Sequence, residues 1–380
     1  MALSRLKSLK KETQNVVETH FFGHLVVGDD LQSAELYRQL CSQHGEAEVA
    51  WLCTVEPSLD ELRPWGPTTL RGESSLLEFS KLYPNAEVEH QEKSPVFYKE
   101  QKFRPFTAKM KSEPLQWGEQ FYSQKGAYPK WEELYHFLND REFMASLGSK
   151  VLSPTIVGLA KITPTDLIQA AEYRLTGADG NFLECQNLYW GRSALEFLNL
   201  FSDKNQLSGD FIQFCEESTT PSSLFVRLKF PKMVSERLET LFLPLSYTHE
   251  WGHWMGEFRL YKDNEGSGQE VEFLTFFDKN ACNEDDLSKK IRLLKRHLEK
   301  IFPLFKGCPY REYIKVEEQT MRLKFDEMLY SKVSGELVNL SLARPNGPFS
   351  AFGASESSFE YSINKIPLAS EASEESLSPS

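Results

Sequence analysis

The chain has 380 residues, of which 40% are hydrophobic and 13% aromatic, enough for a large core in two domains or in one large interleaved domain. Its formal net charge of -12 argues against nucleic acid as the main partner, because phosphate binding requires a basic surface. No apolar run approaches the ~20 residues that cross a bilayer, so we predict no membrane span.

The cysteines and the N-terminal residues indicate in which cellular compartment the protein is expected. Residues 1–19 are basic and carry neither the apolar segment nor the cleavage site of a secretory signal. The six cysteines are widely scattered and none forms a CxxC pair, so we expect neither disulfides nor a cysteine-bound metal. Free cysteines are typical of a reducing compartment, and we therefore predict a soluble, cytoplasmic protein.

The first clear pattern covers residues 24–53. An apolar run over 24–27 ends at Gly28, apolar residues then recur at helical spacing over 34–41, and a second apolar run covers 49–53. This order predicts a strand, a tight turn, a helix and a second strand. A dinucleotide-binding fold places its phosphate turn between such a strand and such a helix.

The turn itself departs from the dinucleotide-binding fingerprint. The three glycines of Gly-x-Gly-x-x-Gly make the turn, let the backbone approach the pyrophosphate, and let the helix pack on the strand. The corresponding residues here are Gly28, Asp30 and Ser33, which are our candidate cofactor-binding positions. Asp29 and Asp30 suit the positive end of a helix dipole, but they repel a diphosphate. The predicted strand, turn and helix are those of a dinucleotide-binding fold, but the residues that would contact the diphosphate are different.

The middle of the chain alternates between strands and helices. Residues 56–131 form a long segment rich in proline, aromatic and charged residues, with a predicted hairpin over 97–105. The elements predicted after it are helix 131–147, strand 151–162, helix 167–175, strand 182–190, and a turn at 191–193 that leads into a helix ending near residue 201.

The second half of the chain has an antiparallel character, because strands there follow one another through short turns. Its predicted elements are strands 224–230, 253–261, 270–277 and 336–342, a hairpin turn at 264–268, and a helix over 287–301 with Asp285 and Asp286 as its cap.

The order of these elements resembles that of the flavin-dependent amine oxidase and protoporphyrinogen oxidase superfamily, which includes UDP-galactopyranose mutase-like relatives. In that family a phosphate turn precedes a substrate-domain insertion, and a strand, turn and helix similar to residues 185–201 then return to the flavin domain. Gly353 echoes the closing glycine segment. The resemblance implies an α/β fold, in which a Rossmann-like FAD/NAD(P)-binding fold is interleaved with an α+β substrate-type domain containing an antiparallel sheet.

The resemblance also implies how the chain is divided. The expected segments are 1–55, an N-terminal helix and the first part of the Rossmann-like domain; 56–150, an inserted substrate or cap-type segment; 151–205, a return to the Rossmann-like domain; 206–305, the antiparallel sheet and helix of the second domain; 306–365, the closing part of the Rossmann-like domain; and 366–380, a disordered tail.

Several contacts that the family makes to flavin are missing. The acidic residue that would hold the ribose aligns with Cys53 or Thr54, and the arginine and double glycine have only Arg71–Gly72 as a distant counterpart. The closing segment lacks the Gly-Asp pair of the family. Relatives of the Rab escort and GDP-dissociation-inhibitor type resemble flavoproteins and work as binding proteins without flavin. The resemblance therefore implies that no cofactor is bound, with FAD as the alternative.

A competing motif lies at residues 249–253. His249, Glu250 and His253 match H-E-x-x-H, in which a helix presents both histidines to zinc and the glutamate acts as general base. Glycines interrupt the local pattern, and the residues after His253 lead directly into a strand. In a strand the glutamate would point away from the histidines. A zinc metallopeptidase is therefore an alternative, and we assign no metal ligand.

The leading hypothesis from the sequence is a flavin amine-oxidase-like fold with a degenerate FAD site, in a non-catalytic binding or regulatory protein. An FAD-dependent oxidoreductase with a divergent phosphate turn and the zinc metallopeptidase are the alternatives. No catalytic residue is assigned, and the expected partner is a protein or a small-molecule ligand that the sequence does not identify.

Overall fold

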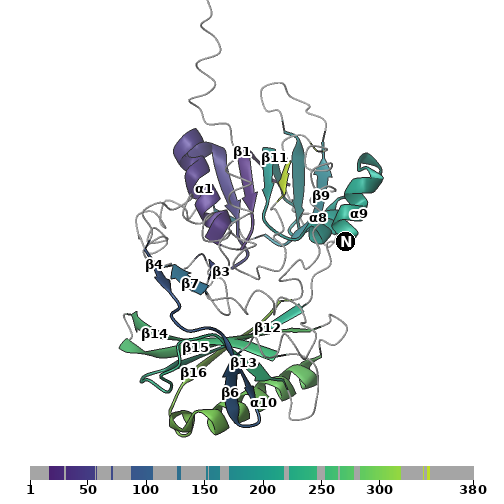
Figure 1. Cartoon of the computed structure of the whole chain (residues 1–380). Helices are drawn as coiled ribbons and strands as arrows, with labels where there is room; N and C mark the ends of the chain where they lie inside the picture. The colour runs from purple at the N-terminus through teal and green to yellow at the C-terminus, as the bar shows by residue number, and fades with distance from the viewer. Residues whose placement is uncertain are drawn as a thin grey trace, which may run out of the picture.

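The computed structural model describes residues 17–29, 31–55, 57, 70–71, 87–105, 126–129, 151–152, 154–162, 171–217, 222–245, 253–263, 266–277, 283–317, 337 and 340–342. Its strands form two large sheets in separate lobes, with a small third sheet between the lobes in the view of Figure 1. No helix in these ranges is long and apolar enough to cross a membrane. Asp30, Gly353, the helix expected over 131–147 and the tail lie outside the described residues.

The upper lobe in Figure 1 contains the predicted βαβ unit. The strand β1 is parallel to β2 on one side and to β11 on the other. The bounds are Thr19–Val27 for β1, Leu31–His44 for helix α1, Glu46–Glu48 for the 3-10 turn η1, Val49–Leu52 for β2 and Phe182–Trp190 for β11. The predicted strand, tight turn, helix and second strand are therefore confirmed, and so is the strand over 182–190.

The single strand predicted over 151–162 is wrong, because the structure has two strands there. Strand β8 (Val151–Leu152) pairs with β2, whereas β9 (Ile156–Lys161) pairs with β10 (Tyr173–Gly177). Pro154 lies between β8 and β9, and it has no N–H to donate to a ladder. The chain therefore leaves one side of the sheet at this proline and joins the other.

The helix predicted over 167–175 is wrong at its C-terminal end. Tyr173 and Leu175 belong to β10, which pairs in antiparallel fashion with both β9 and β11. Tyr173 and Leu175 are buried while Arg174 and Thr176 are only partly buried, which is the period of two expected for a strand. Residues 163–170 lie outside the described part.

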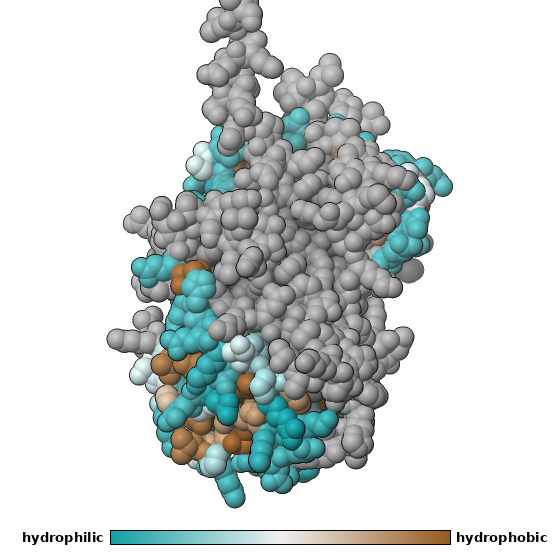
Figure 2. Space-filling view, viewed as in Figure 1, coloured by the Kyte–Doolittle hydropathy of each residue, from teal (hydrophilic) through white to brown (hydrophobic). Residues whose placement is uncertain are grey.

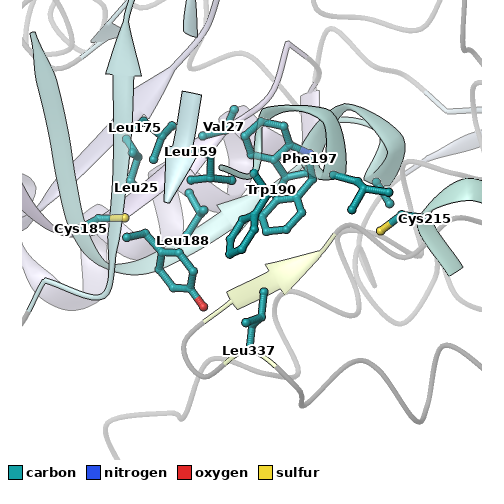
Figure 3. Close-up of a cluster of buried hydrophobic side chains, with 14 of the residues drawn as sticks. Leu25, Val27, Leu159, Leu175, Cys185, Leu188, Trp190, Phe197, Cys215 and Leu337 are labelled. Atoms are coloured by element: carbon teal, nitrogen blue, oxygen red, sulfur yellow. The ribbon is translucent and has the colours of Figure 1, made fainter. Parts of the chain in front are cut away.

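A cluster of buried apolar side chains, drawn in Figure 3, joins the upper sheet to its helices. Trp190, at the end of β11, packs edge-on against Phe197 of helix α8 (Ala194–Leu200), with ring centroids 5.6 Å apart. The Ser193 hydroxyl caps α8 by accepting a 3.0 Å hydrogen bond from the backbone N–H of Glu196. The predicted turn and helix after β11 are confirmed. The remaining elements of this lobe are η3 (Lys204–Gln206), α9 (Gly209–Glu217) and β17 (Leu340–Leu342), which runs parallel to β11.

The second large sheet has the strand order β16-β12-β15-β14-β13-β5-β6, and both predicted hairpins lie in it. Helix α10 covers one face of this sheet, below it in Figure 1, and Leu294 and Leu298 are fully buried there. The side chain of Asn283 caps α10, so the predicted cap at Asp285 and Asp286 is wrong by two to three residues. The bounds are β5 Val96–Lys99, β6 Lys102–Pro105, β12 Ser222–Phe230, β13 Leu241–Pro244, β14 His253–Asp263, β15 Gly266–Phe277, α10 Glu284–Ile301, η5 Pro303–Phe305 and β16 Arg311–Glu317.

The small sheet has the order β3-β7-β4, and all of its pairs are antiparallel. Its strands are β3 Leu70–Arg71, β7 Gly126–Pro129 and β4 Val88–His90. Just after β4, Gln91 is buried against the second large sheet, where its amide lies 3.3 Å from a carboxylate oxygen of Glu257. The residue that follows β4 is thereby attached to the lower lobe.

We expect Gly256→Ala to lower the free energy of unfolding by about 1–3 kcal/mol. Gly256 and Phe273 face each other across β14 and β15, and a methyl group on Gly256 would lie 2.1 Å from the fully buried ring of Phe273. Denaturant unfolding measures the loss. Gly209→Ala is the matched control, because a methyl group there meets nothing within 4 Å, and it should change the stability little. Equal effects of the two substitutions would contradict the packing argument.

Candidate functional site at the carboxyl ends of the parallel strands

The turn after β1 is held by the two strands beside it. The backbone N–H of Gly28 donates to the carbonyl of Leu52 at 3.1 Å, and the indole N–H of Trp51 donates to the carbonyl of Gly28 at 2.8 Å. On the other side, the N–H of Gly191 donates to the carbonyl of Val27 at 2.7 Å. The carboxyl ends of β1, β2 and β11 therefore meet around Gly28.

Gly28 and Gly191 allow a close approach of strands and helix. A Cβ on Gly28 would lie 2.0 Å from Ser33 Oγ, and a Cβ on Gly191 would lie 2.9 Å from the carbonyl oxygen of Val27. Ser33 of α1 is buried against both glycines. The structure thus brings two of the three predicted site residues, Gly28 and Ser33, into contact, while Asp30 lies outside the described residues.

Gly191 is a site residue that the sequence reasoning noted only as part of a turn. A signal was present, because Gly191 ends an apolar strand as Gly28 does. Parallel strands that end in glycine bring two Cβ-free positions to the same edge of a sheet. Recognising the pair requires knowing that β1 and β11 are neighbours, and residues 19–27 and 182–190 are far apart in sequence.

The side chain of Asp29 lies between the ends of β1 and β2. Its Oδ1 accepts a 2.5 Å hydrogen bond from the backbone N–H of Thr54, and its Oδ2 accepts a 2.9 Å bond from the Thr54 hydroxyl. Asp29 Oδ2 also forms an ion pair with Arg192 Nη2 at 3.1 Å. This carboxylate was expected near the N-terminus of α1, and the structure instead ties it to the residues that follow β2 and β11.

Arg192 connects this carboxylate to helix α8. Its Nη1 lies 3.1 Å from Glu196 Oε1, and its Nη2 lies 3.5 Å from the Thr54 hydroxyl. The Arg192 side chain is only 16% exposed, whereas that of Glu196 is 40% exposed. Asp29, Thr54, Arg192 and Glu196, which we call the Asp29 bridge, carry one positive and two negative charges.

The position expected for a ribose-binding acid is not acidic in this structure. Cys53, directly after β2, is buried, and its thiol lies 3.3 Å from the carbonyl of Val55. Thr54 is engaged by Asp29 through both its N–H and its hydroxyl. Among the described residues, the carboxylate that contacts the end of β2 through Thr54 is that of Asp29, which comes from the end of β1.

A pair of histidines packs beside this sheet. The ring of His24 in β1 stacks on His44 with centroids 4.1 Å apart, and His24 Nδ1 lies 3.0 Å from the hydroxyl of Tyr189. Burial, and next the charge of His44, lower the pKa of His24 to about 4. Burial raises the pKa of Tyr189 above its usual range. His24 is thus neutral and Tyr189 is protonated at neutral pH.

We expect the free energy of unfolding to fall by ~2 kcal/mol as the pH falls from about 6.5 to about 4, because of His24. In this window the unfolded chain takes up a proton on His24 and the folded chain does not, so acid favours unfolding. Urea unfolding at the two ends of the window measures the loss. His24→Gln should reduce the slope, and a variant with the full wild-type slope would contradict this assignment.

The histidine motif is not helical at its C-terminal end. His253 is the first residue of strand β14, so a helix does not carry both histidines at positions i and i+4. His249 and Glu250 lie outside the described residues. Within the described ranges, no group of three or more His, Cys, Asp or Glu side chains is placed to hold a metal ion.

Comparisons with known proteins identify the fold. No family model matches the sequence, and no curated protein matches it either. Among solved structures, an oxidoreductase from Methanosarcina mazei aligns over 91% of this chain and 100% of its own, with a TM-score of 0.55 and 10% identity. Reduced UDP-galactopyranose mutase aligns over 90% of this chain and 92% of its own, with a TM-score of 0.54 and 10% identity. Putrescine oxidase bound to putrescine aligns over 91% and 99%, with a TM-score of 0.51 and 9% identity.

The chain therefore has the same fold as these three structures, which confirms the fold class predicted from the sequence. Its two large sheets correspond to an α/β, Rossmann-like part and a second part with an antiparallel sheet. FAD is compatible with this fold, and the fold gives no support to the expectation that no cofactor is bound.

Proposed function

We propose that this chain is a non-catalytic binding or regulatory protein in which the Asp29 bridge closes the phosphate turn to flavin. The supporting observation is the position of the Asp29 carboxylate, which accepts the backbone N–H and the hydroxyl of Thr54 and pairs with Arg192. A ligand of such a protein is a small molecule or another protein that does not need the turn.

The residues at the turn do not fit a dinucleotide diphosphate. The two negative charges of Asp29 and Glu196 exceed the single positive charge of Arg192, so the bridge repels an anion. Arg192, the cation of the bridge, is already engaged by both carboxylates. A diphosphate bound to Arg192 would have to break the partly buried ion pair between Arg192 and Asp29. The negative charge of Asp29 would then lie beside the negative charges of the diphosphate.

The buried Ser33 adds a steric argument. In the fingerprint, the second and third glycines leave room for a pyrophosphate and for close helix packing. Here the hydroxyl of Ser33 takes up the space beside Gly28 and Gly191. The contact of Ser33 with both glycines supports a structural role for Gly28 and Ser33 in place of cofactor binding.

The experiment is a flavin titration of the purified full-length chain. Flavin is released by denaturation and quantified, and the flavin-free protein is then titrated with FAD by calorimetry. The proposal predicts no stoichiometric flavin and no saturable heat. Retention of one flavin per chain would overturn it.

An FAD-dependent oxidoreductase is the second candidate, and one observation favours it. Gly28 and Gly191 still meet at the carboxyl edge of parallel strands, where dinucleotides bind in this class of fold. The structurally similar putrescine oxidase is an enzyme with a bound amine substrate. Stoichiometric flavin whose colour bleaches anaerobically on addition of an amine would establish this candidate.

A further inference from the structure

The strand β16 forms the outer edge of the second large sheet. In the described part of the chain it pairs only with β12, and the seven residue pairs from Lys229↔Arg311 to Ser223↔Glu317 follow one another without a shift. An edge strand presents unpaired N–H and C=O groups to a further strand. Natural edges are protected by proline, bulges, short length or charge.

The two edges of this sheet differ in their protection. The opposite edge, β6, has four residues, and Lys102, Arg104 and Pro105 are among them. The strand β16 has seven residues, no proline and no bulge. Three of its apolar side chains are exposed, Tyr313 by 38%, Ile314 by 47% and Val316 by 39%. Four of its seven residues are charged, but two are basic and two acidic, so a second strand can match them with opposite charges. Edge β16 thus has the length and regularity of a strand that pairs with another strand.

We propose that β16 pairs with β16 of a second copy of this chain, in antiparallel fashion about a two-fold axis, and that the two seven-stranded sheets thereby become continuous. A two-fold axis perpendicular to the sheet leaves every side chain on the same face of the sheet. Two residues directly opposite each other must therefore point to the same face, which requires that their residue numbers differ by zero or by an even number. Few registers satisfy this condition, and the charges of β16 distinguish between them.

The register centred on Ile314 is complementary in charge. It places Arg311 opposite the partner's Glu317, Tyr313 opposite the partner's Lys315, and Ile314 opposite its own copy. The Arg311–Glu317 and Tyr313–Lys315 pairs each occur twice because of the two-fold symmetry, whereas the Ile314 pair lies on the axis and occurs once. Opposite charges and aromatic pairs across antiparallel strands stabilise a sheet, and a lysine over a tyrosine ring adds a cation–π contact.

The neighbouring registers bring like charges together. Centring the pair on Tyr313 places Arg311 opposite the partner's Lys315, and centring it on Lys315 places two lysines face to face. Centring it on Glu312 places two glutamates face to face. Like charges directly opposite each other destabilise a sheet. The register centred on Val316 avoids them but aligns only residues 315–317, whereas the register centred on Ile314 aligns the whole strand. The sequence of β16 therefore favours the register centred on Ile314.

The apolar part of the interface lies on the side of α10. Ile314 faces Val226 and Val316 faces Leu224 in the ladder with β12, and these partners point into the core under α10. Lys295 of α10 reaches Glu312 at 2.6 Å, which fixes the helix beside this edge. Figure 2 shows hydrophobic surface among hydrophilic residues on this lobe. In the register centred on Ile314, pairing would bring the two Ile314 side chains together and place Val316 beside the partner's Glu312.

The interface is small. A single pair of seven-residue strands buries less than the ~800 Å² per partner of a stable complex. We therefore expect a dimer that forms with increasing protein concentration and dissociates on dilution. Sedimentation velocity of the full-length chain over a concentration series measures it. A single monomeric species at every concentration would overturn the proposal.

Two variants test the surface and the register separately. Ile314→Lys should weaken dimerisation at least tenfold, whereas Leu304→Lys, at a 62% exposed apolar residue outside β16, should leave it unchanged. Arg311→Glu should also weaken the dimer, and adding Glu317→Arg to the same chain should restore it. Circular dichroism checks that each variant is folded. Dimerisation that is insensitive to Ile314→Lys, or a charge-reversed pair that fails to restore it, contradicts β16 pairing in this register.

Discussion

Asp29→Asn is expected to gain saturable FAD binding that the wild-type chain lacks, which corresponds to at least about a tenfold increase in affinity, or about 1.4 kcal/mol. The substitution keeps the shape of the side chain and an oxygen that can accept the N–H of Thr54, but it removes the negative charge that faces Arg192. The guanidinium is then partnered only by the partly exposed Glu196 and is available to a phosphate. Calorimetric titration with FAD measures the change.

Asp203→Asn provides the matched control for this prediction. Asp203 lies in the same lobe, where its side chain caps the 3-10 turn η3, and the substitution changes the net charge by the same amount. A tighter FAD complex in both variants would mean that overall charge is responsible. If Asp29→Asn binds FAD no better than the wild-type chain, the Asp29 bridge is not what excludes the diphosphate.

Glu272→Gln is expected to lower the free energy of unfolding by ~3 kcal/mol, because it removes a buried charge from between two arginines. Glu272 Oε1 lies 2.5 Å from Arg227 Nε and 3.4 Å from Arg259 Nη2, and the exposed fractions of the Glu272 and Arg227 side chains are 2% and 5%. The neutral amide of glutamine leaves the positive charges of the two arginines buried with less negative charge beside them. Urea unfolding at neutral pH measures the loss.

Glu184→Gln is the control for burial. Glu184 pairs with Arg174 across β10 and β11 at 2.5 Å, in the same kind of cross-strand geometry, but Arg174 is 40% exposed. Solvent screening should limit the loss to less than about 1 kcal/mol. Equal losses in the two variants would show that burial does not determine the strength of these pairs.

Local patterns were sufficient for much of the fold. The apolar run that ends at Gly28, the strand over 182–190 and the apolar stripe of α10 each have one period and a clear stop, and all three form as predicted. Both hairpins of the second sheet were marked by turn residues between short apolar runs. In these segments the local propensity agrees with the tertiary packing.

The errors arose where tertiary pairing decides the structure. The strand β10 is buried because it lies between two other strands, and this position is not encoded in its own sequence. Pro154 separates two strands that belong to opposite sides of one sheet, although apolar, β-branched residues occur on both sides of it in the sequence. In both cases the structure is determined by hydrogen bonds to a strand that is distant in the sequence.

The candidate site was only half predictable for the same reason. Gly28 and Ser33 are close in sequence, so the fingerprint identified them together. The bridge joins Asp29 to Thr54, 25 positions away, and Thr54 to Arg192, 138 positions away. The acidic turn was visible in the sequence, but the cation and the hydroxyl that neutralise it became visible only when β2 and β11 were placed on either side of β1.

A crystal structure of the full-length chain grown with saturating FAD tests the closed turn most directly. We predict the Asp29 carboxylate within hydrogen-bond distance of the Thr54 N–H and of the Arg192 guanidinium, with no dinucleotide over Gly28. A pyrophosphate at Gly28 with Arg192 turned onto its oxygens, and Asp29 displaced from Thr54, would contradict the account.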